Sequence, residues 1–167
     1  MLDISLVIPV YNEVESLGPL VEKIRAELEQ HDYGWEIVFI DDGSTDGSTT
    51  RIQELMETDD RIILAIQRRN FGKSLALEVG FALATGDVVI TMDADLQDEP
   101  AEIPNLLQKI NDGYDLVVGW KKVRNDPLSK TIPSYIANRT TRLLTGVQLH
   151  DMNSGLKAMR SDVGRTI

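Results

Sequence analysis

The sequence predicts an α/β fold with a mostly parallel central sheet and helices on both faces of that sheet. Three observations support this prediction. Short runs of apolar and β-branched residues, typical of buried strands, begin at intervals of about 26 to 31 residues. Segments with apolar residues at helical spacing lie between these runs. Polar clusters follow the runs directly, at the edge where parallel sheets bind their ligands.

The first part of the chain alternates strand and helix patterns. We predict buried strands over 4–10, 35–40 and 61–66. A helical pattern runs from Leu17 to Leu28, with Ser16 as the expected N-cap and Pro19 in the first turn. A second helical pattern spans Ile52 to Met56, after a turn-rich stretch over 41–47.

The same alternation continues in the second part. We predict strands over 88–92, 116–119 and 155–160. Helices are expected from Leu75 to near Gly86, from near Pro104 to Gly113, over 133–145 and from Ser161 onward. Because proline is costly inside a helix, residues 98–102 are predicted to form a turn. The short last helix suggests a single domain over 1–167 that is truncated at its C-terminus.

Composition excludes several classes of function. The formal net charge of -10 argues against a non-specific nucleic-acid partner, which needs a basic surface. The absence of cysteine excludes disulfides and thiolate zinc sites. No apolar run approaches the roughly 20 residues of a membrane-spanning helix, and no signal peptide is recognisable. We therefore expect a cytoplasmic domain, and a phosphate-bearing ligand would need a metal ion to bring positive charge.

The most informative stretch follows the predicted strand over 88–92. Asp93, Asp95 and Gln97 occupy alternate positions, so an extended backbone would project all three side chains from one side. Two carboxylates and an amide oxygen suit a hard divalent cation. The alternative is a solvated acidic turn that caps the next helix. Polar clusters after the other strands favour the metal site, because all would meet at one edge of the sheet; they are 11–13, 41–42 and 70–73.

Four motifs in this order resemble glycosyltransferase family 2. They are Val-Ile-Pro-Val-Tyr-Asn-Glu (7–13), Asp-Asp-Gly-Ser-Thr-Asp-Gly (41–47), Arg-Asn-Phe-Gly-Lys (69–73) and Gly-Asp-Val-Val-Ile-Thr-Met-Asp-Ala-Asp-Leu-Gln-Asp (86–98). The subgroup that looks most similar is the polyprenyl-phosphate sugar transferases. The resemblance covers Ile4 to Arg160 and implies a Rossmann-like GT-A nucleotide-sugar transferase fold. It further implies a nucleotide-diphosphate sugar donor and a Mg²⁺ or Mn²⁺ ion.

The resemblance also implies roles for individual residues. Those expected to bind the nucleotide are Pro9, Tyr11, Glu13, Asp41, Asp42, Asn70, Lys73 and Asp93. Asp93, Asp95 and Gln97 match the metal and diphosphate segment, and the glutamine is characteristic of the subgroup that uses a lipid-phosphate acceptor. The full-length protein would then work at the cytoplasmic face of a membrane.

The chemistry implied is an inverting sugar transfer. A cation held by Asp93 and Asp95 would neutralise the departing diphosphate, so Asp95 counts among the catalytic residues. Asp151 precedes the Ser-Gly motif of the family and is the candidate base or orienting group near the acceptor. Lys121 and Lys130 are candidates for binding phosphate, and Lys121 stands where many members carry arginine.

Other interpretations of these residues stay open at this point. Tyr11 could cover the sheet edge, Asp46 and Asp98 could cap helices, and Lys121 and Lys130 could be solvated charges. At the level of the whole chain, the alternatives are a receiver-like signalling domain, a nucleotidyltransferase and a non-catalytic nucleotide-sugar binder. A receiver usually takes its acidic pair from the first strand, whereas Asp41 and Asp42 follow the second.

Overall fold

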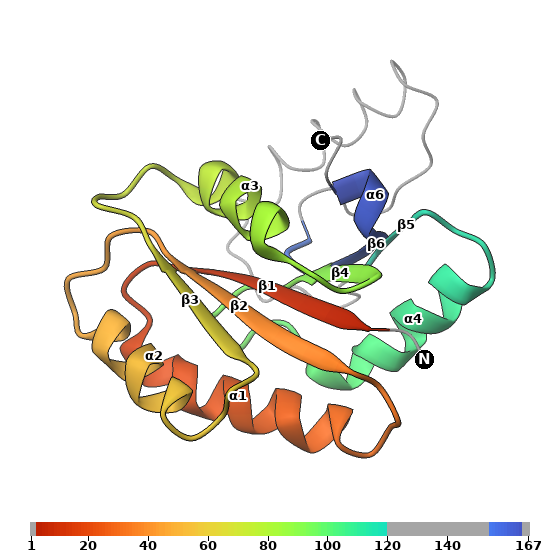
Figure 1. Ribbon diagram of the computed structural model, residues 1–167, viewed down its shortest axis with the longest axis horizontal. Coiled ribbons are helices and arrows are strands. Elements are labelled where there is room, and N and C mark those ends of the chain that lie inside the picture. The colour runs from red at the N-terminus through yellow and green to blue at the C-terminus, as the bar shows by residue number, and fades with distance from the viewer. Residues whose placement is uncertain (1–2, 120–153, 165–167) are drawn as a thin grey trace, which may run out of the picture.

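The computed structural model describes residues 3–119 and 154–164, which form one six-stranded sheet flanked by helices (Figure 1). The strands are β1 (Ile4–Val10), β2 (Trp35–Asp41), β3 (Ile62–Ile66), β4 (Val88–Thr91), β5 (Leu116–Val118) and β6 (Lys157–Arg160). The helices are α1 (Val14–Leu28), α2 (Ser48–Met56), α3 (Lys73–Leu83), α4 (Ile103–Asn111), α6 (Ser161–Gly164) and the 3-10 helix η1 (Pro100–Glu102).

The strand order β3-β2-β1-β4-β6-β5 creates a switch point beside β1. The chain builds outward from β1 through β2 to β3, then returns to place β4 on the other side of β1. These four strands are parallel, and β6 lies antiparallel between β4 and β5. The predicted mostly parallel sheet is therefore confirmed. Loops that leave β1 and β4 must diverge at the switch point, which opens a crevice between them.

Each face of the sheet is covered by its own layer of helices. Alternate residues of β1 point to opposite sides, so Leu6 and Ile8 join the core under α1 and α4, while Val7 joins the core under α3. Figure 1 shows α3 on one face and α1 and α2 on the other. Each aliphatic side chain buried completely in these cores contributes about 1.5–3 kcal/mol. The prediction of helices on both faces is confirmed.

Helix α3 packs against β1 and β2 at Gly80, which has no side chain. A methyl group at this position would overlap the side chains of Val7 and Ile40.

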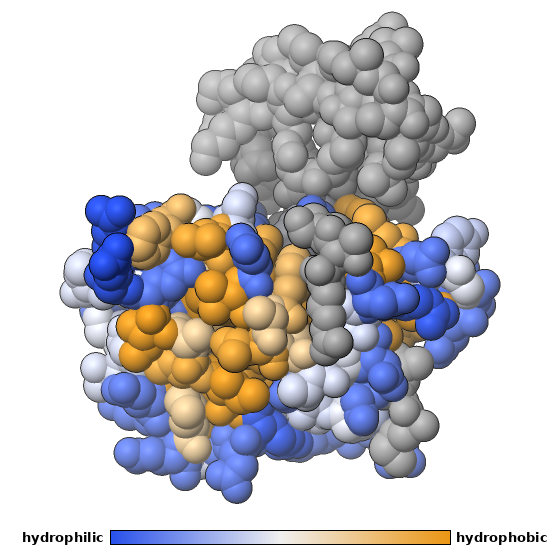
Figure 2. Space-filling model, turned by 45° about the horizontal axis from the view of Figure 1, so that its top comes forward, coloured by the Kyte–Doolittle hydropathy of each residue, from blue (hydrophilic) through white to orange (hydrophobic). Residues whose placement is uncertain are grey.

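The outer side of α3, which faces away from the sheet, is also apolar. Leu75 and Leu83 are exposed there, and an apolar area covers this helix in the view of Figure 2. None of the helices in the described ranges is long and apolar enough to cross a membrane.

The start of α1 differs from the prediction, and the start of α4 agrees with it. Helix α1 begins at Val14, not after Ser16, because the Val14 N–H donates to Asp46 from the distant β2–α2 loop. Ser16 therefore lies inside the helix, and Pro19 lies one turn later than predicted. Helix α4 begins at Ile103, as predicted near Pro104, and part of the turn predicted over 98–102 forms the 3-10 helix η1. The helix predicted over 133–145 lies outside the described residues.

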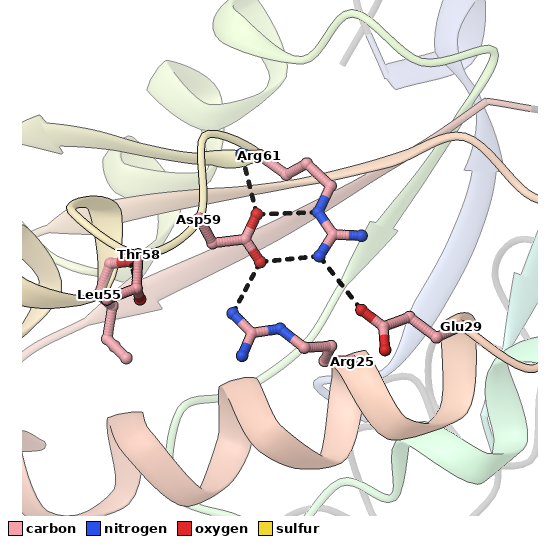
Figure 3. Close-up of polar contacts among 6 residues, drawn as sticks. All are labelled: Arg25, Glu29, Leu55, Thr58, Asp59 and Arg61. Atoms are coloured by element: carbon pink, nitrogen blue, oxygen red, sulfur yellow. Dashed lines mark hydrogen bonds and ion pairs between the residues drawn. The ribbon is translucent and has the colours of Figure 1, made fainter.

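At the amino ends of the strands, a charged cluster joins α1 to the start of β3 (Figure 3). Asp59 accepts hydrogen bonds from Arg25 at 2.7 Å and from the Arg61 side chain at 2.8 and 2.9 Å. Arg61 also reaches Glu29 at 3.3 Å and stacks 3.6 Å from the Trp35 ring centre. The Asp59 side chain is only 5% exposed. The Arg61 guanidinium first, and Arg25 after it, hold the pKa of Asp59 well below its usual range against the opposing effect of burial.

Candidate functional site

A cleft of about 330 Å³ opens at the switch point, between the loops that follow β1 and β4. The loops that follow β2 and β3 close its other sides. The residues that line it are Pro9, Val10, Tyr11, Glu13, Asp42, Asn70, Gly72, Lys73, Asp93, Ala94 and Asp95. Its size falls in the range of small-molecule sites. Polar side chains from four separate loops thus meet in one cavity.

Most of the predicted donor-site residues line this cleft. Those that do are Pro9, Tyr11, Glu13, Asp42, Asn70, Lys73, Asp93 and Asp95. Asp41 and Gln97 do not belong to the lining. The three remaining candidates, Asp151, Lys121 and Lys130, lie outside the described residues. The structure therefore assembles the nucleotide and metal candidates and leaves the acceptor candidates as predictions.

The loop after β1 is held in place by the loop after β2. The Asn12 N–H donates to Ser44 Oγ at 3.0 Å, and the Asn12 side-chain oxygen accepts from the Thr45 N–H at 2.8 Å. The Glu13 N–H donates to Ser48 Oγ at 2.9 Å. Asn12 adopts a left-handed conformation with φ of 57°, which asparagine tolerates better than most residues. These bonds direct Tyr11, whose ring is half-exposed, and Glu13 toward the cleft.

Asp46 ties two helices to this loop, as predicted for a capping residue. Its carboxylate accepts from the Val14 N–H at 3.1 Å and from the Ser48 N–H at 2.9 Å, the first residues of α1 and α2. Slight burial raises the pKa of Asp46, but the hydrogen bonds from Ser48 and Val14 outweigh it, so the pKa lies below its ordinary value. The Asp46 carboxylate therefore fixes the loop that follows β1, which carries Tyr11 and Glu13 into the cleft.

The acidic pair after β2 divides into two different environments. Asp41 is completely buried, and it accepts hydrogen bonds from the Ser44 N–H at 2.8 Å and from the Thr49 hydroxyl. This geometry favours a structural role for Asp41 over the predicted nucleotide contact. Asp42 lines the cleft but also accepts from the Phe71 and Gly72 N–H groups at 2.7 and 2.8 Å. Asp42 therefore fixes the β3–α3 loop at the rim of the cleft.

That fixed loop presents Lys73 as the first residue of α3. The Lys73 ammonium pairs with Asp93 Oδ1 across the cleft. The positive end of the α3 dipole and the lysine charge act in the same place. This corner of the cleft consequently suits an anionic group, and a phosphate is the best candidate.

The loop after β4 carries the predicted metal ligands. Asp93 and Asp95 line the cleft, and Asp95 Oδ1 accepts from the Gln97 N–H at 3.0 Å. Leu96, which lies between Asp95 and Gln97, is left-handed with φ of 63°. This conformation is strained for leucine, and such strain is typical of functional loops. The backbone turns over 94–96 and does not stay extended as the prediction assumed, so the Gln97 side chain is exposed and lies outside the cleft lining.

Two residues behind Asp93 were not included among the predicted site residues. Asp98 is buried and accepts from the Asp93 N–H at 3.0 Å. Gly155 lies so close that a Cβ atom there would sit 2.5 Å from Asp93 Oδ2 and 2.7 Å from Asp98 Oδ2. The Gly155 carbonyl is held by the Thr91 hydroxyl at 2.7 Å. The Ser-Gly pair at 154–155 gave the only sequence signal for this contact, and the contact itself depends on the antiparallel pairing of β6 with β4.

The donor set fits a hard divalent cation that is shared with a ligand. Within the described residues, no group of three or more histidine, cysteine or acidic side chains could hold a metal ion. Asp93 and Asp95 together supply carboxylate oxygens, and the open cleft leaves room for water and phosphate oxygens to complete a shell of about six. Such a site would bind a cation weakly alone and more tightly together with a diphosphate.

The chain matches a family model and several characterised relatives. The model for glycosyl transferase family 2 covers residues 5–166. A dodecaprenyl-phosphate galacturonate synthase from Rhizobium johnstonii is 38% identical over 97% of this chain and 49% of its own length. An undecaprenyl-phosphate 4-deoxy-4-formamido-L-arabinose transferase from Pseudomonas syringae pv. syringae is 42% identical over 96% of this chain and 48% of its own. The chain thus spans about half the length of these curated relatives.

Solved structures share the fold at lower identity. Glucosyl-3-phosphoglycerate synthase from Mycobacterium tuberculosis, in complex with UDP, superposes with a TM-score of 0.73 at 22% identity, over 97% of this chain and 58% of that one. A mannosyltransferase from Pyrobaculum calidifontis, in complex with GDP-Man and Mn²⁺, gives 0.69 at 22% identity, over 94% and 44%. The predicted GT-A fold is confirmed. The family match leaves the receiver-like and nucleotidyltransferase alternatives without support.

Proposed function

The chain belongs to glycosyl transferase family 2, and from this premise we propose that it forms the donor-binding part of a metal-dependent, inverting glycosyltransferase. The donor is a UDP- or GDP-sugar, and the acceptor is a polyprenyl phosphate. The observation that carries this proposal is the cleft at the switch point, where eight predicted residues from four loops come together. Charge supports it as well, because an acidic chain needs a cation in order to hold a diphosphate.

The donor would lie along the cleft with its two ends recognised differently. Tyr11 and Glu13 offer an aromatic surface and a hydrogen-bond acceptor for the nucleoside at the β1 end. Lys73 and the start of α3 offer positive charge for the diphosphate. Asp93 and Asp95 would hold Mg²⁺ or Mn²⁺, which stabilises the negative charge on the departing diphosphate when it is bound.

In the transfer, an oxygen of the acceptor phosphate forms a bond to the anomeric carbon of the sugar. The bond from that carbon to the diphosphate oxygen breaks, and the electron pair leaves with the nucleoside diphosphate. Attack opposite the leaving group inverts the configuration. A phosphate acceptor is ionised at neutral pH and needs no general base, so the role proposed for Asp151 is to orient the acceptor. Lys121 and Lys130 are proposed to pair with its phosphate.

The acceptor class is proposed from the named relatives, which use dodecaprenyl or undecaprenyl phosphate. Identity near 40% over nearly all of this chain supports carrying this class over. Because such an acceptor resides in a bilayer, the full-length protein is proposed to act at the cytoplasmic face of a membrane.

The donor part of the proposal can be tested by thermal unfolding of the 167-residue chain. A panel of UDP- and GDP-sugars is added with Mn²⁺, with Mn²⁺ replaced by EDTA, and Mn²⁺ is added alone. We expect one nucleotide class at about 100 times its Kd to raise Tm by about 5–10 °C, and only with Mn²⁺. A panel without any metal-dependent shift would contradict the proposal.

Transfer itself is tested with the full-length protein and a short polyprenyl phosphate. Formation of a glycosyl phospholipid of inverted configuration supports the reaction. Metal-dependent donor binding without any transfer, across all sugars of the nucleotide class that binds, would instead identify a non-catalytic nucleotide-sugar binder.

A further inference from the structure

Lys73 pairs with the same carboxylate that the proposed metal ion needs. Its ammonium contacts Asp93 Oδ1, and both side chains line the cleft. We propose that Lys73 is an exchangeable counter-ion: it occupies Asp93 before the cation arrives, and then moves to the donor diphosphate when the cation takes its place. This inference rests on the proposed function, and it assigns Lys73 a positioning role through Asp93.

The surroundings of the pair allow this exchange. The Lys73 side chain is 50% exposed and the Asp93 side chain 31% exposed, so water can replace either partner. Ion pairs with this exposure contribute little to stability, and their geometry is readily exchanged. The backbone of Lys73 is by contrast fixed, because Asp42 holds the preceding Phe71 and Gly72 N–H groups. The flexible lysine side chain can therefore swing while its attachment point stays at the rim of the cleft.

A divalent cation and the ammonium compete for the same oxygen atom. Oδ1 of Asp93 accepts the ammonium directly, and two positive groups at one carboxylate repel each other. When the cation binds, the ammonium must leave Oδ1, and the open side of the cleft is where the diphosphate would lie. The other Asp93 oxygen, Oδ2, lies against Gly155, where a Cβ atom would come within 2.5 Å of it, so Oδ1 is the oxygen at which the two positive groups meet.

This exchange couples cation and nucleotide binding. A cation that binds alone must displace Lys73 without any new partner for the ammonium. A cation that binds with a nucleoside diphosphate releases Lys73 onto a phosphate, which gains a charge-assisted hydrogen bond. The two ligands should consequently bind more tightly together than separately, and by the same factor in either order.

The decisive test compares the wild type with Lys73→Met, using Mn²⁺ alone and then Mn²⁺ with UDP or GDP. Mn²⁺ affinity is measured by electron paramagnetic resonance, and nucleotide affinity by calorimetry. We expect Lys73→Met to bind Mn²⁺ alone about two- to fivefold more tightly than the wild type. This factor corresponds to the energy that a half-exposed ion pair contributes. The same variant should bind the nucleoside diphosphate with Mn²⁺ about tenfold more weakly, because a charged hydrogen bond is lost. Lys73→Arg should restore much of both values.

Lys109→Met is the matched control. Lys109 of α4 pairs with Asp112 at 2.9 Å, and its side chain is 55% exposed, but it does not belong to the cleft lining. The Lys109→Met substitution removes the same charge as Lys73→Met, but at a residue outside the cleft lining. It should therefore leave the Mn²⁺ affinity and the nucleotide affinity unchanged.

The opposite signs for Mn²⁺ alone and for the nucleotide separate this inference from other outcomes. A Lys73→Met variant with unchanged or weaker Mn²⁺ binding overturns it, whether or not the nucleotide binds. Mn²⁺ binding that is undetectable in both proteins overturns it too, because Lys73 would then not be what limits the cation. If Mn²⁺ alone binds more tightly but no nucleoside diphosphate binds the wild type, the counter-ion role stands and the proposed function fails.

Discussion

Asp59 and Asp93 lie at opposite ends of the same mostly parallel sheet, and each pairs with a basic side chain. Asp59 is almost completely buried between two guanidinium groups that approach it from α1 and from the start of β3 (Figure 3). Asp93 is about one third exposed and pairs with a single flexible lysine across an open cleft. The amino ends of the strands thus carry a closed ionic cluster, and the carboxyl ends carry an open one.

The difference follows from what each carboxylate contacts. Both oxygens of Asp59 receive hydrogen bonds from within the fold, and planar guanidinium groups hold it in a fixed geometry. Asp93 uses its backbone N–H to reach Asp98 and leaves its carboxylate at the cavity wall. A closed cluster stabilises the fold, whereas an open one can exchange its partner for a ligand. Mutations at the two ends should therefore separate stability from binding.

The largest expected effect is on binding, from Asp95→Asn. Asparagine keeps the Oδ1 atom that accepts from the Gln97 N–H, so the loop should survive, but the negative charge for the cation is lost. We expect Mn²⁺-dependent affinity for the nucleoside diphosphate to fall by about 100-fold, the upper end of the losses seen even for outer-shell partners of metal sites. Calorimetry measures this change, and urea unfolding should show unchanged stability. Unchanged affinity would contradict the metal assignment.

The converse expectation is a loss of stability without a loss of binding, from Asp59→Asn. The amide cannot neutralise Arg25 and Arg61, which remain partly buried. We expect the free energy of unfolding to fall by about 2 kcal/mol. This is less than the cost of breaking a fully buried ion pair, because both arginines are partly exposed. Urea unfolding at pH 7 measures it.

Asp112→Asn is the matched control for that loss, since Asp112 forms an exposed pair with Lys109. It should change stability by less than about 0.5 kcal/mol. Equal losses in the two variants, or weakened nucleotide binding in Asp59→Asn, would erase the distinction between the closed and open ends.

The extent to which each end could be predicted from the sequence also differs. Apolar runs and turn residues predicted the strands from β1 to β4, and the topology rule for parallel sheets then brought the polar loops together in one cleft. Local patterns carry that information because a strand and the loop after it are continuous in the chain.

Contacts between segments that are distant in the chain could not be predicted from these local sequence patterns. The start of α1 depends on Asp46, which is 32 residues away, and the wall behind Asp93 depends on Gly155, which reaches it only because β6 inserts antiparallel beside β4. The prediction for Gln97 failed for a local reason, because the backbone turns over 94–96, with Leu96 left-handed, and this turn breaks the alternation that the predicted role assumed. The charged cluster around Asp59 has no recognisable sequence motif.

Gly155→Ala probes the wall of the open end and should have a smaller effect than Asp95→Asn. The added methyl group would displace the Asp93 carboxylate or the backbone that precedes β6, because it would lie 2.5 Å from Asp93 Oδ2. We expect Mn²⁺-dependent nucleotide affinity to fall by about tenfold. Gly18→Ala is the control, since a methyl group there meets only the flexible end of Arg51. A lower Tm with unchanged affinity would mean that Gly155 serves packing alone.

The smallest expected effect is the contribution of Asp59 to the pH dependence of stability. Its pKa is lowered in the folded chain by Arg61 and Arg25, so between the folded value and the unfolded value near 4 the unfolded chain binds more protons. Stability from this group is therefore fully present above about pH 5 and is lost as pH falls through that window. Lowering the pH from 6 to 3.5 should reduce the free energy of unfolding of both proteins. The reduction should be about 0.7 kcal/mol larger for the wild type than for Asp59→Asn. Urea unfolding of both proteins at the two pH values measures this difference, in which the other carboxylates cancel. Parallel losses would show that Asp59 titrates as an ordinary exposed carboxyl, and the end of the sheet in Figure 3 would then be as open as the cleft.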